Sequence, residues 1–206
     1  MLKILGRRTS SNVMKVLWAC DEMGLKYEQV DVGGPFGGND KPEYLAKNPN
    51  GRVPTIDDNG FILWESNAIV RYLASQHGVG GLWPADAKVR GDADRWMDWQ
   101  QTVLAPAFFP CFWNLVRTPE DKRDMGAVQK SKEATAKTWE MVDRALSGRK
   151  FIAGDTFTMG DIPIGMMCFR WYTLAPEFKK PANLDSWYKR LQERPAYKTH
   201  CMNPLS

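Results

Sequence analysis

The sequence predicts two structural units in series, an α/β domain built on a mixed four-stranded sheet followed by an all-α, helical-bundle domain. Over roughly the first 75 residues, short strand patterns alternate with helical patterns, whereas only helical spacing remains later in the chain. A glycine-rich stretch, GVGGLWPADAK, separates the two regions and is typical of a linker. We therefore expect the α/β domain at 1–77, a linker at 78–86 and the helical domain at 87–206.

The first half of the α/β domain has the pattern of a strand–helix–strand unit. Apolar and polar residues alternate over residues 2–4, which favours a short strand. A helix is expected next, with Asn12 as its N-cap and Gly24 as its stop, and residues 27–32 form the following strand. Strands joined through a helix pair in parallel, so this half predicts a parallel pair.

The second half of this domain predicts an antiparallel hairpin. A short helix is expected near residues 41–47. Two strands are expected at 53–56 and 61–64, joined by a tight turn at 58–60 with the sequence DNG. Directly after the hairpin, Ser66 is expected to cap a helix. The parallel pair and the hairpin together make a mixed sheet.

The remainder of the chain predicts helices only. Apolar residues at helical spacing predict a first helix that Pro106 and Pro110 should kink or end. A long helix is expected within 119–146, a stretch almost free of helix breakers, and a last full helix should stop before Pro195. Asp161 follows Thr158 by three residues, as in a capping box with Asp in place of Glu.

Composition and charge exclude several classes of function. The 206 residues carry 28 basic and 24 acidic side chains, a balance typical of a solvated surface and not of a nucleic-acid-binding face. Four widely spaced cysteines and two histidines argue against a metal site, a dithiol motif and a histidine-dependent nucleophile. No stretch has the length of a membrane span, and the first residues do not form a signal peptide. We expect a cytoplasmic protein without a membrane or nucleic-acid partner.

Three segments in a fixed order carry a family resemblance: TSSNVMKV near the start, NPNGRVPTI with LWES in the middle, and GDTFTMGDI near residue 160. The chain resembles the cytosolic glutathione transferase family over essentially its whole length. It is most similar to bacterial members with Ser or Thr at the catalytic position. The resemblance implies a thioredoxin-like first domain, glutathione as co-substrate, a role in detoxification and a homodimer.

The resemblance also implies where the thiol is activated. Matching the family spacing onto Val16 makes Ser10 the candidate donor to the glutathione thiolate, with the amide of Asn12 as a second donor. A hydroxyl and the N-terminus of a helix both stabilise a thiolate. A shift of one residue would bring Thr9 or Ser11 to the same place, and all these residue types also suit plain helix capping.

Glutathione itself would be bound by later motifs. By the resemblance, Val53-Pro54 is a cis peptide whose Val53 backbone pairs with the cysteinyl part of glutathione as an added strand would. Ser66, at a helix N-terminus, would bind the γ-glutamyl carboxylate, and Glu65 would face the ammonium group.

Two cations are candidates for a glutathione carboxylate. Arg52 precedes the cis-proline motif, where several family members carry Gln, and a solvated side chain is the alternative interpretation. Lys41 is a second candidate, for the glycyl carboxylate.

Other residues are assigned to folding or to the second substrate. Asp161 resembles a buried capping residue of the family, and we expect it to serve folding. Aromatic residues in the helical domain are candidates for the electrophile pocket: Phe108, Phe112, Trp113 and Trp171.

The predicted function is a glutathione S-transferase that ionises the glutathione thiol for attack on a small, largely hydrophobic electrophile. A glutathione-dependent disulfide reductase or peroxidase is an alternative on the same fold, and an isomerase or dehalogenase is also compatible. A non-catalytic binding protein with this fold is the alternative from another class.

Overall fold

The computed structural model describes residues 1–205. Its first half contains four strands and three helices, in the order β1 (Leu2–Leu5), α1 (Ser11–Glu22), β2 (Tyr27–Val30), α2 (Pro42–Leu45), β3 (Thr55–Asp58), β4 (Phe61–Trp64) and α3 (Ser66–His77). Its second half contains helices only, in the order α4 (Ala87–Trp99), α5 (Ala105–Phe112), α6 (Met125–Ala145), α7 (Asp161–Leu174), α8 (Ala182–Gln192) and α9 (Pro195–Cys201). Short 3₁₀ and π turns lie between them, at η1 (Gly34–Phe36), η2 (Gln100–Leu104), η3 (Trp113–Arg117) and η4 (Glu120–Lys122).

The four strands form one mixed sheet, as the sequence predicts. Their order is β2-β1-β3-β4, with β1 parallel to β2 and antiparallel to β3, and with β3 antiparallel to β4. The hairpin turn between β3 and β4 places Asn59 and Gly60 at positive φ angles of 53° and 95°. A turn of this kind requires two such residues, which explains why Asn-Gly stands there.

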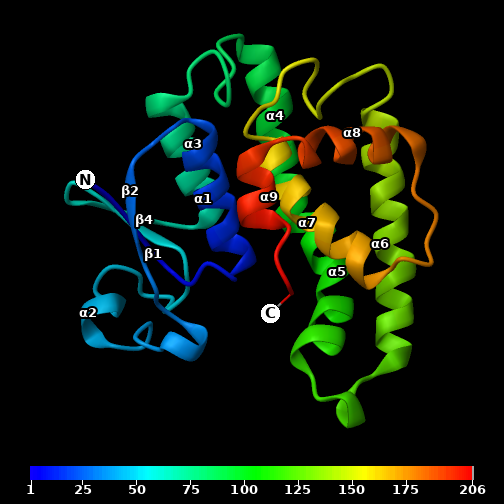
Figure 1. Ribbon diagram of the computed structural model, residues 1–206, viewed down its shortest axis with the longest axis horizontal. Coiled ribbons are helices and arrows are strands. Elements are labelled where there is room, and N and C mark those ends of the chain that lie inside the picture. The colour runs from blue at the N-terminus through cyan, green and yellow to red at the C-terminus, as the bar shows by residue number, and fades with distance from the viewer. Residues whose placement is uncertain (206) are drawn as a thin grey trace.

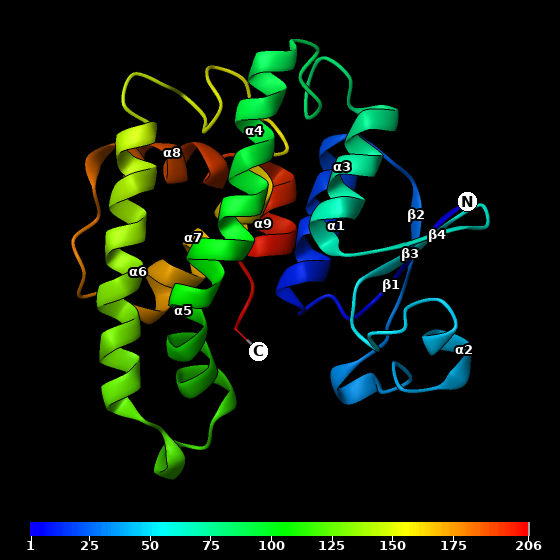
Figure 2. The same cartoon turned by 180° about the vertical axis from the view of Figure 1, so that it is seen from behind.

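Helices α1 and α3 lie between the sheet and the helical domain in both ribbon views (Figures 1 and 2). Helix α1 is buried on every side, because each residue from Val13 to Cys20 is buried. On one side it packs against α3, and on the other it contacts α7 and α9 of the helical domain. Helix α1 is therefore the element that both halves of the protein share.

Close packing at this shared helix depends on one glycine and one tryptophan. A Cβ atom on Gly165 of α7 would lie 2.9 Å from the Trp18 ring and 2.7 Å from Leu191, so only glycine lets α7 approach. Trp18 also meets the Tyr197 ring edge-on, with centroids 4.8 Å apart. None of the helices within residues 1–205 combines the length and the apolar character that a membrane span requires.

Some element boundaries differ from those expected. Strand β3 runs over Thr55–Asp58 and not over 53–56, since Pro54 has no N–H to donate to a sheet. Pro106 and Pro110 do not end the helix in which they occur. A π-helical turn at Gln100–Leu104 widens the helix just before the Pro106 ring, and Pro110 lies inside α5.

Asp161 is fully buried at the start of α7 and accepts hydrogen bonds from three residues. The donors are the backbone N–H of Ile152 at 2.9 Å, the N–H of Thr158 at 2.9 Å and the indole N–H of Trp187 at 2.8 Å. Burial raises the pKa of Asp161 to about 6, while these hydrogen bonds oppose the rise. One carboxylate thus connects the loop before α7 to α8.

We expect Asp161→Ala to lower the free energy of unfolding by roughly 3 kcal/mol, because it leaves several buried N–H donors without an acceptor. Urea unfolding at neutral pH measures the change. Asp155→Ala, in an exposed position of the same loop, is the matched control and should change stability by less than about 0.5 kcal/mol. Unchanged stability of the Asp161 variant would contradict its role in folding.

Candidate functional site

A cavity of about 500 Å³ lies between the two halves of the molecule. The α/β half supplies side chains from the loop after β1, the start of α1 and the loops after β2 and α2: Arg7, Ser11, Asn12, Gly34 and Arg52. The helical half supplies mainly aromatic, sulfur-containing and cationic side chains from the π turns, α5 and α7: Gln100, Ala105, Phe108, Phe109, Phe112, Trp113, Arg117, Met166, Met167 and Arg170.

The start of α1 reaches this cavity. Ser10 occupies the N-cap position, where the sequence predicts Asn12, and Asn12 is the second residue of the helix. The Ser10 hydroxyl makes no hydrogen bond to the described residues, although the residue is only 9% exposed. The hydroxyl oxygen of Ser10 is not completely buried, so it retains access to solvent. The side chains of Ser11 and Asn12 line the cavity directly.

The start of α3 lies beside the start of α1. The Ser66 hydroxyl donates to Asn12 Oδ1 at 3.3 Å, so two of the predicted site residues are in contact. Ser66 is the first residue of α3, and Glu65 and not Ser66 occupies the N-cap position. Glu65 adopts a left-handed φ of 72°, a conformation that costs a non-glycine residue about 1–3 kcal/mol and often marks a functional site.

The loop before β3 has the expected cis peptide between Val53 and Pro54. The backbone N–H and C=O of Val53 have no hydrogen-bond partner among residues 1–205. The preceding carbonyl, that of Arg52, accepts from the Tyr44 hydroxyl at 2.6 Å and from the Asn48 amide at 2.8 Å. This anchored loop therefore leaves the Val53 backbone free to pair with an extended ligand.

The two predicted cations are placed differently. Arg52 lines the cavity with an exposed side chain. Lys41 is also exposed, at the N-cap of α2, but it is not part of the cavity lining. Among the aromatic candidates, Phe108, Phe112 and Trp113 do line the cavity, whereas Trp171 does not.

Trp171 belongs to the core of the helical domain, where its ring meets the rings of Phe108 and Phe178 at centroid distances of 6.2 Å and 5.4 Å. Among residues 1–205, no cluster of three or more His, Cys, Asp or Glu side chains is arranged to hold a metal ion.

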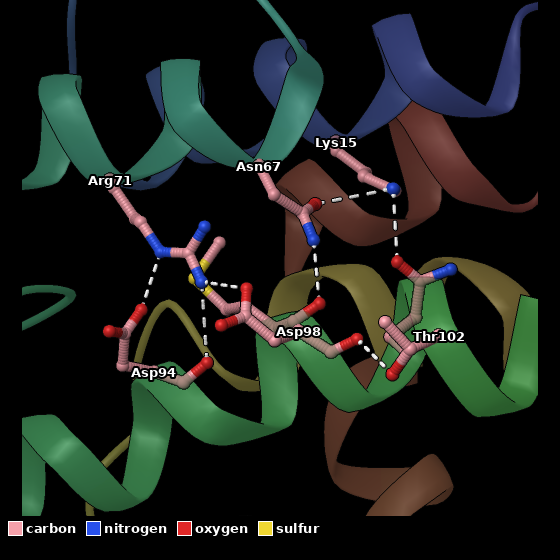
Figure 3. A network of polar contacts seen from close by, with 8 residues as sticks. Lys15, Asn67, Arg71, Asp94, Asp98 and Thr102 are labelled. Atoms are coloured by element: carbon pink, nitrogen blue, oxygen red, sulfur yellow. Dashed lines mark hydrogen bonds and ion pairs between the residues drawn. The ribbon is translucent and has the colours of Figure 1, made fainter.

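Beneath the starts of α1 and α3 lies a buried cation that sequence reasoning missed. The Lys15 ammonium donates to Ser66 Oγ at 3.3 Å, Asn67 Oδ1 at 3.2 Å and Gln100 Oε1 at 3.1 Å. Figure 3 shows Lys15 reaching from α1 toward Asn67 on α3. The sequence did contain a signal, since Lys15 is the one charged residue between Val13 and Cys20 and the other residues there are all apolar.

The same network joins α3 to α4. The Asn67 amide donates to the Met97 carbonyl at 2.8 Å, and the Arg71 guanidinium binds Asp94 and Asp98 (Figure 3). The start of α3 is thereby fixed against the helical domain.

In its protonated form, Lys15 also contributes positive potential next to Ser66. Complete burial lowers the pKa of Lys15 to about 7, and the Glu65 carboxylate opposes this effect. The N-termini of α1 and α3 add positive potential, so the site is electropositive.

Replacing Lys15 by Met should change how stability depends on pH. Unfolded Lys15 has a pKa of about 10.4, above its value in the folded protein, so between about pH 7 and pH 10 the unfolded chain binds more protons. The free energy of unfolding of the wild type should therefore rise relative to Lys15→Met over this window, by up to about 1.4 kcal/mol per pH unit. Urea unfolding at several pH values measures this difference.

Lys130→Met, which removes an exposed lysine of α6, serves as the control and should not alter the pH dependence. Parallel stability curves for the wild type and Lys15→Met would show that the pKa of Lys15 is not lowered.

Comparison with known proteins agrees with this architecture. The family model described as glutathione S-transferase, N-terminal domain, matches residues 1–75, and the corresponding C-terminal domain model matches residues 102–195. The chain is 40% identical over 208 residues to glutathione S-transferase GstB of Escherichia coli, with all of both chains covered. It is 30% identical over 212 residues to glutathione S-transferase 3 of Zea mays, covering 99% of this chain and 95% of the relative.

A solved structure extends this similarity to three dimensions. The theta class glutathione S-transferase of Xanthomonas axonopodis pv. citri, determined with glutathione bound, superposes with a TM-score of 0.95 at 44% identity, covering 100% of this chain and 99% of that one. The four-stranded mixed sheet followed by a helical domain is the expected thioredoxin-like and all-α arrangement. The chain belongs to the glutathione S-transferase family.

Proposed function

We propose that the chain binds glutathione along the α/β side of the cavity and activates its thiol for attack on an electrophile. The N-terminus of α3 with Ser66 would bind the γ-glutamyl carboxylate, next to the Lys15 ammonium, while Glu65 would meet the γ-glutamyl ammonium. The unpaired backbone of Val53 would take the cysteinyl part. Arg52, or Lys41 farther out, would meet the glycyl carboxylate.

The observation that carries the proposal is the free hydroxyl at the N-cap of α1. A thiol with a pKa of about 8.5 is mostly protonated at neutral pH, and lowering that pKa by two units takes about 2.7 kcal/mol of preferential stabilisation of the thiolate. The Ser10 hydroxyl has no competing partner among the described residues. The N-terminus of α1 adds positive electrostatic potential that also stabilises a thiolate. Asn12 offers an amide N–H two residues further on.

The second substrate would enter from the helical side. Phe108, Phe112 and Trp113 form an aromatic wall, with Phe109 added to those predicted. The wall suits an electrophile with an apolar body. Holding the thiolate and the electrophile in one cavity supplies the proximity on which such a reaction depends.

We further propose that the enzyme works as a cytoplasmic homodimer in detoxification. Cys20, Cys111, Cys168 and Cys201 are all buried free thiols, which is typical of a reducing compartment. Membership of the family supports the homodimer, and the half-exposed Phe61 on β4 is a candidate contact with the second copy.

Sedimentation at micromolar concentration should give the mass of two chains. If sedimentation at the assay concentration gave the mass of one chain, the dimer would be contradicted and the catalytic proposal would be unaffected.

Ser10→Ala should raise the pKa of bound glutathione by at least about one unit and lower kcat/KM at pH 6.5 by about tenfold or more. The measurements are thiolate absorbance of bound glutathione against pH and turnover of chlorodinitrobenzene. Ser11→Ala is the matched control, one residue along the same helix start, and should have a much smaller effect. The reverse result would assign the hydroxyl donor to Ser11, which lines the cavity directly.

A further inference from the structure

Arg170 of α7 is a buried cation in the wall of the cavity. It is only 4% exposed, and its guanidinium lies 5.0 Å from the centroid of the Phe112 ring and 3.7 Å from the sulfur of Met14. It forms no ion pair with a carboxylate of residues 1–205. Other partly buried arginines do form such ion pairs, as Arg71 does with Asp94 and Arg194 does with Glu22.

A buried guanidinium without a counter-ion is unfavourable. Burial, followed by the nearby guanidinium groups of Arg117 and Arg7, lowers the pKa of Arg170 to about 10, so the group still carries its charge at neutral pH. A buried charge normally has a partner of opposite sign, because its desolvation costs several kcal/mol. The side chain is therefore held in a cavity wall as a cation with no carboxylate partner among residues 1–205.

Arg7 approaches the same space from the α/β half. It also forms no ion pair within the described part of the chain, and burial and the neighbouring Arg117 lower its pKa. Gly34 leaves room for its side chain, because a Cβ atom there would lie 2.9 Å from Arg7 Nε. Gly34 has a φ of +60°, so both space and backbone favour glycine there. Arginines from both halves thus converge on one cavity.

The helical side of this cavity is the side assigned to the electrophile. Arg170 lies next to Phe112, whereas the proposed glutathione-binding groups, such as Ser66 and Val53, all belong to the α/β half. Guanidinium groups bind carboxylates through paired, charge-assisted hydrogen bonds, and the aromatic wall accepts an apolar body.

We propose that the second substrate is an anionic electrophile, with a carboxylate bound by Arg170 and Arg7 and an aromatic or other apolar body held by the phenylalanines of α5. This inference rests on the proposed function, whose electrophile it specifies. With a chlorinated nitroarene as electrophile, the glutathione thiolate forms a bond to the ring carbon, chloride leaves with the electrons of the carbon–chlorine bond, and the thiol proton has already passed to solvent. The carboxylate takes no part in bond changes.

The test compares chloronitrobenzoate with chloronitrobenzamide, two electrophiles of nearly equal shape that differ in charge. Each kcat/KM is divided by the uncatalysed rate with glutathione at the same pH, to remove the difference in intrinsic reactivity. We expect the wild type to favour the benzoate by about tenfold or more, as a charge-assisted hydrogen bond in a partly desolvated site allows. Arg170→Met should abolish this preference, and Arg170→Lys should keep part of it.

Arg144→Met removes an exposed arginine of α6 and is the matched control, which should keep the wild-type preference. Arg7→Met provides a second variant with a half-buried side chain, should Arg170→Met fail to fold. It should reduce the preference for the benzoate in the same direction.

Three results would overturn the inference. The wild type could show no preference for the benzoate, or the arginine variants could slow both electrophiles equally. The variants could instead raise the KM for glutathione and leave the preference intact, which would assign the arginines to a glutathione carboxylate. Failure of the proposed function is a separate result, because the wild type would then turn over neither these compounds nor neutral chlorodinitrobenzene.

Discussion

The complete burial of helix α1 is the constraint on which the other features of this protein rest. This helix packs between α3 of the first half and α7 and α9 of the second, so it joins the two halves in one hydrophobic core. Because its middle is buried on every side, α1 meets the cavity at its N-terminus, through Ser11 and Asn12 next to Ser10. The same burial obliges Lys15 to find hydrogen-bond acceptors inside the protein, which it does on α3 and on the π turn after α4.

The acceptors of Lys15 connect the site to the interface between the halves. Ser66 opens α3, and Gln100 lies in the π turn that lines the cavity. A π turn inside a long helix is an uncommon feature that often occurs at functional sites. Here the helix continues past Pro106 because the π turn widens it just before the proline ring. The same turn places Gln100 where it contacts the Lys15 ammonium and lines the cavity. The polar network therefore fixes the relative position of the two walls.

Positive charge accumulates around the cavity at several points. The N-termini of α1 and α3, the Lys15 ammonium, and the arginines Arg7 and Arg170 all contribute. A thiolate, the carboxylates of glutathione and an anionic electrophile would all be stabilised by the same positive potential. The aromatic side chains beside these charges lower the local polarity, which would strengthen electrostatic interactions with a bound ligand. One arrangement of charge would thus serve both the proposed thiol activation and the proposed choice of substrate.

The order of elements, the mixed sheet and the family all follow from the amino-acid sequence alone, because strand and helix periodicity and three local motifs are properties of neighbouring residues. The turn at Asn59-Gly60 is a clear case, since its backbone geometry demands those residue types. The sequence also predicted Asn12 and Ser66 as site residues, which the fold brings within 3.3 Å. Their connection to Lys15, and the convergence of Arg7 with Arg170, arise only in the folded chain. These contacts join residues as far apart as Met14 and Arg170, and no local pattern records such a distance in sequence. Whether a lysine or arginine is solvated or buried depends on which other elements pack around it. For the residues of this site, that packing exists only in the folded protein, where both halves contact α1.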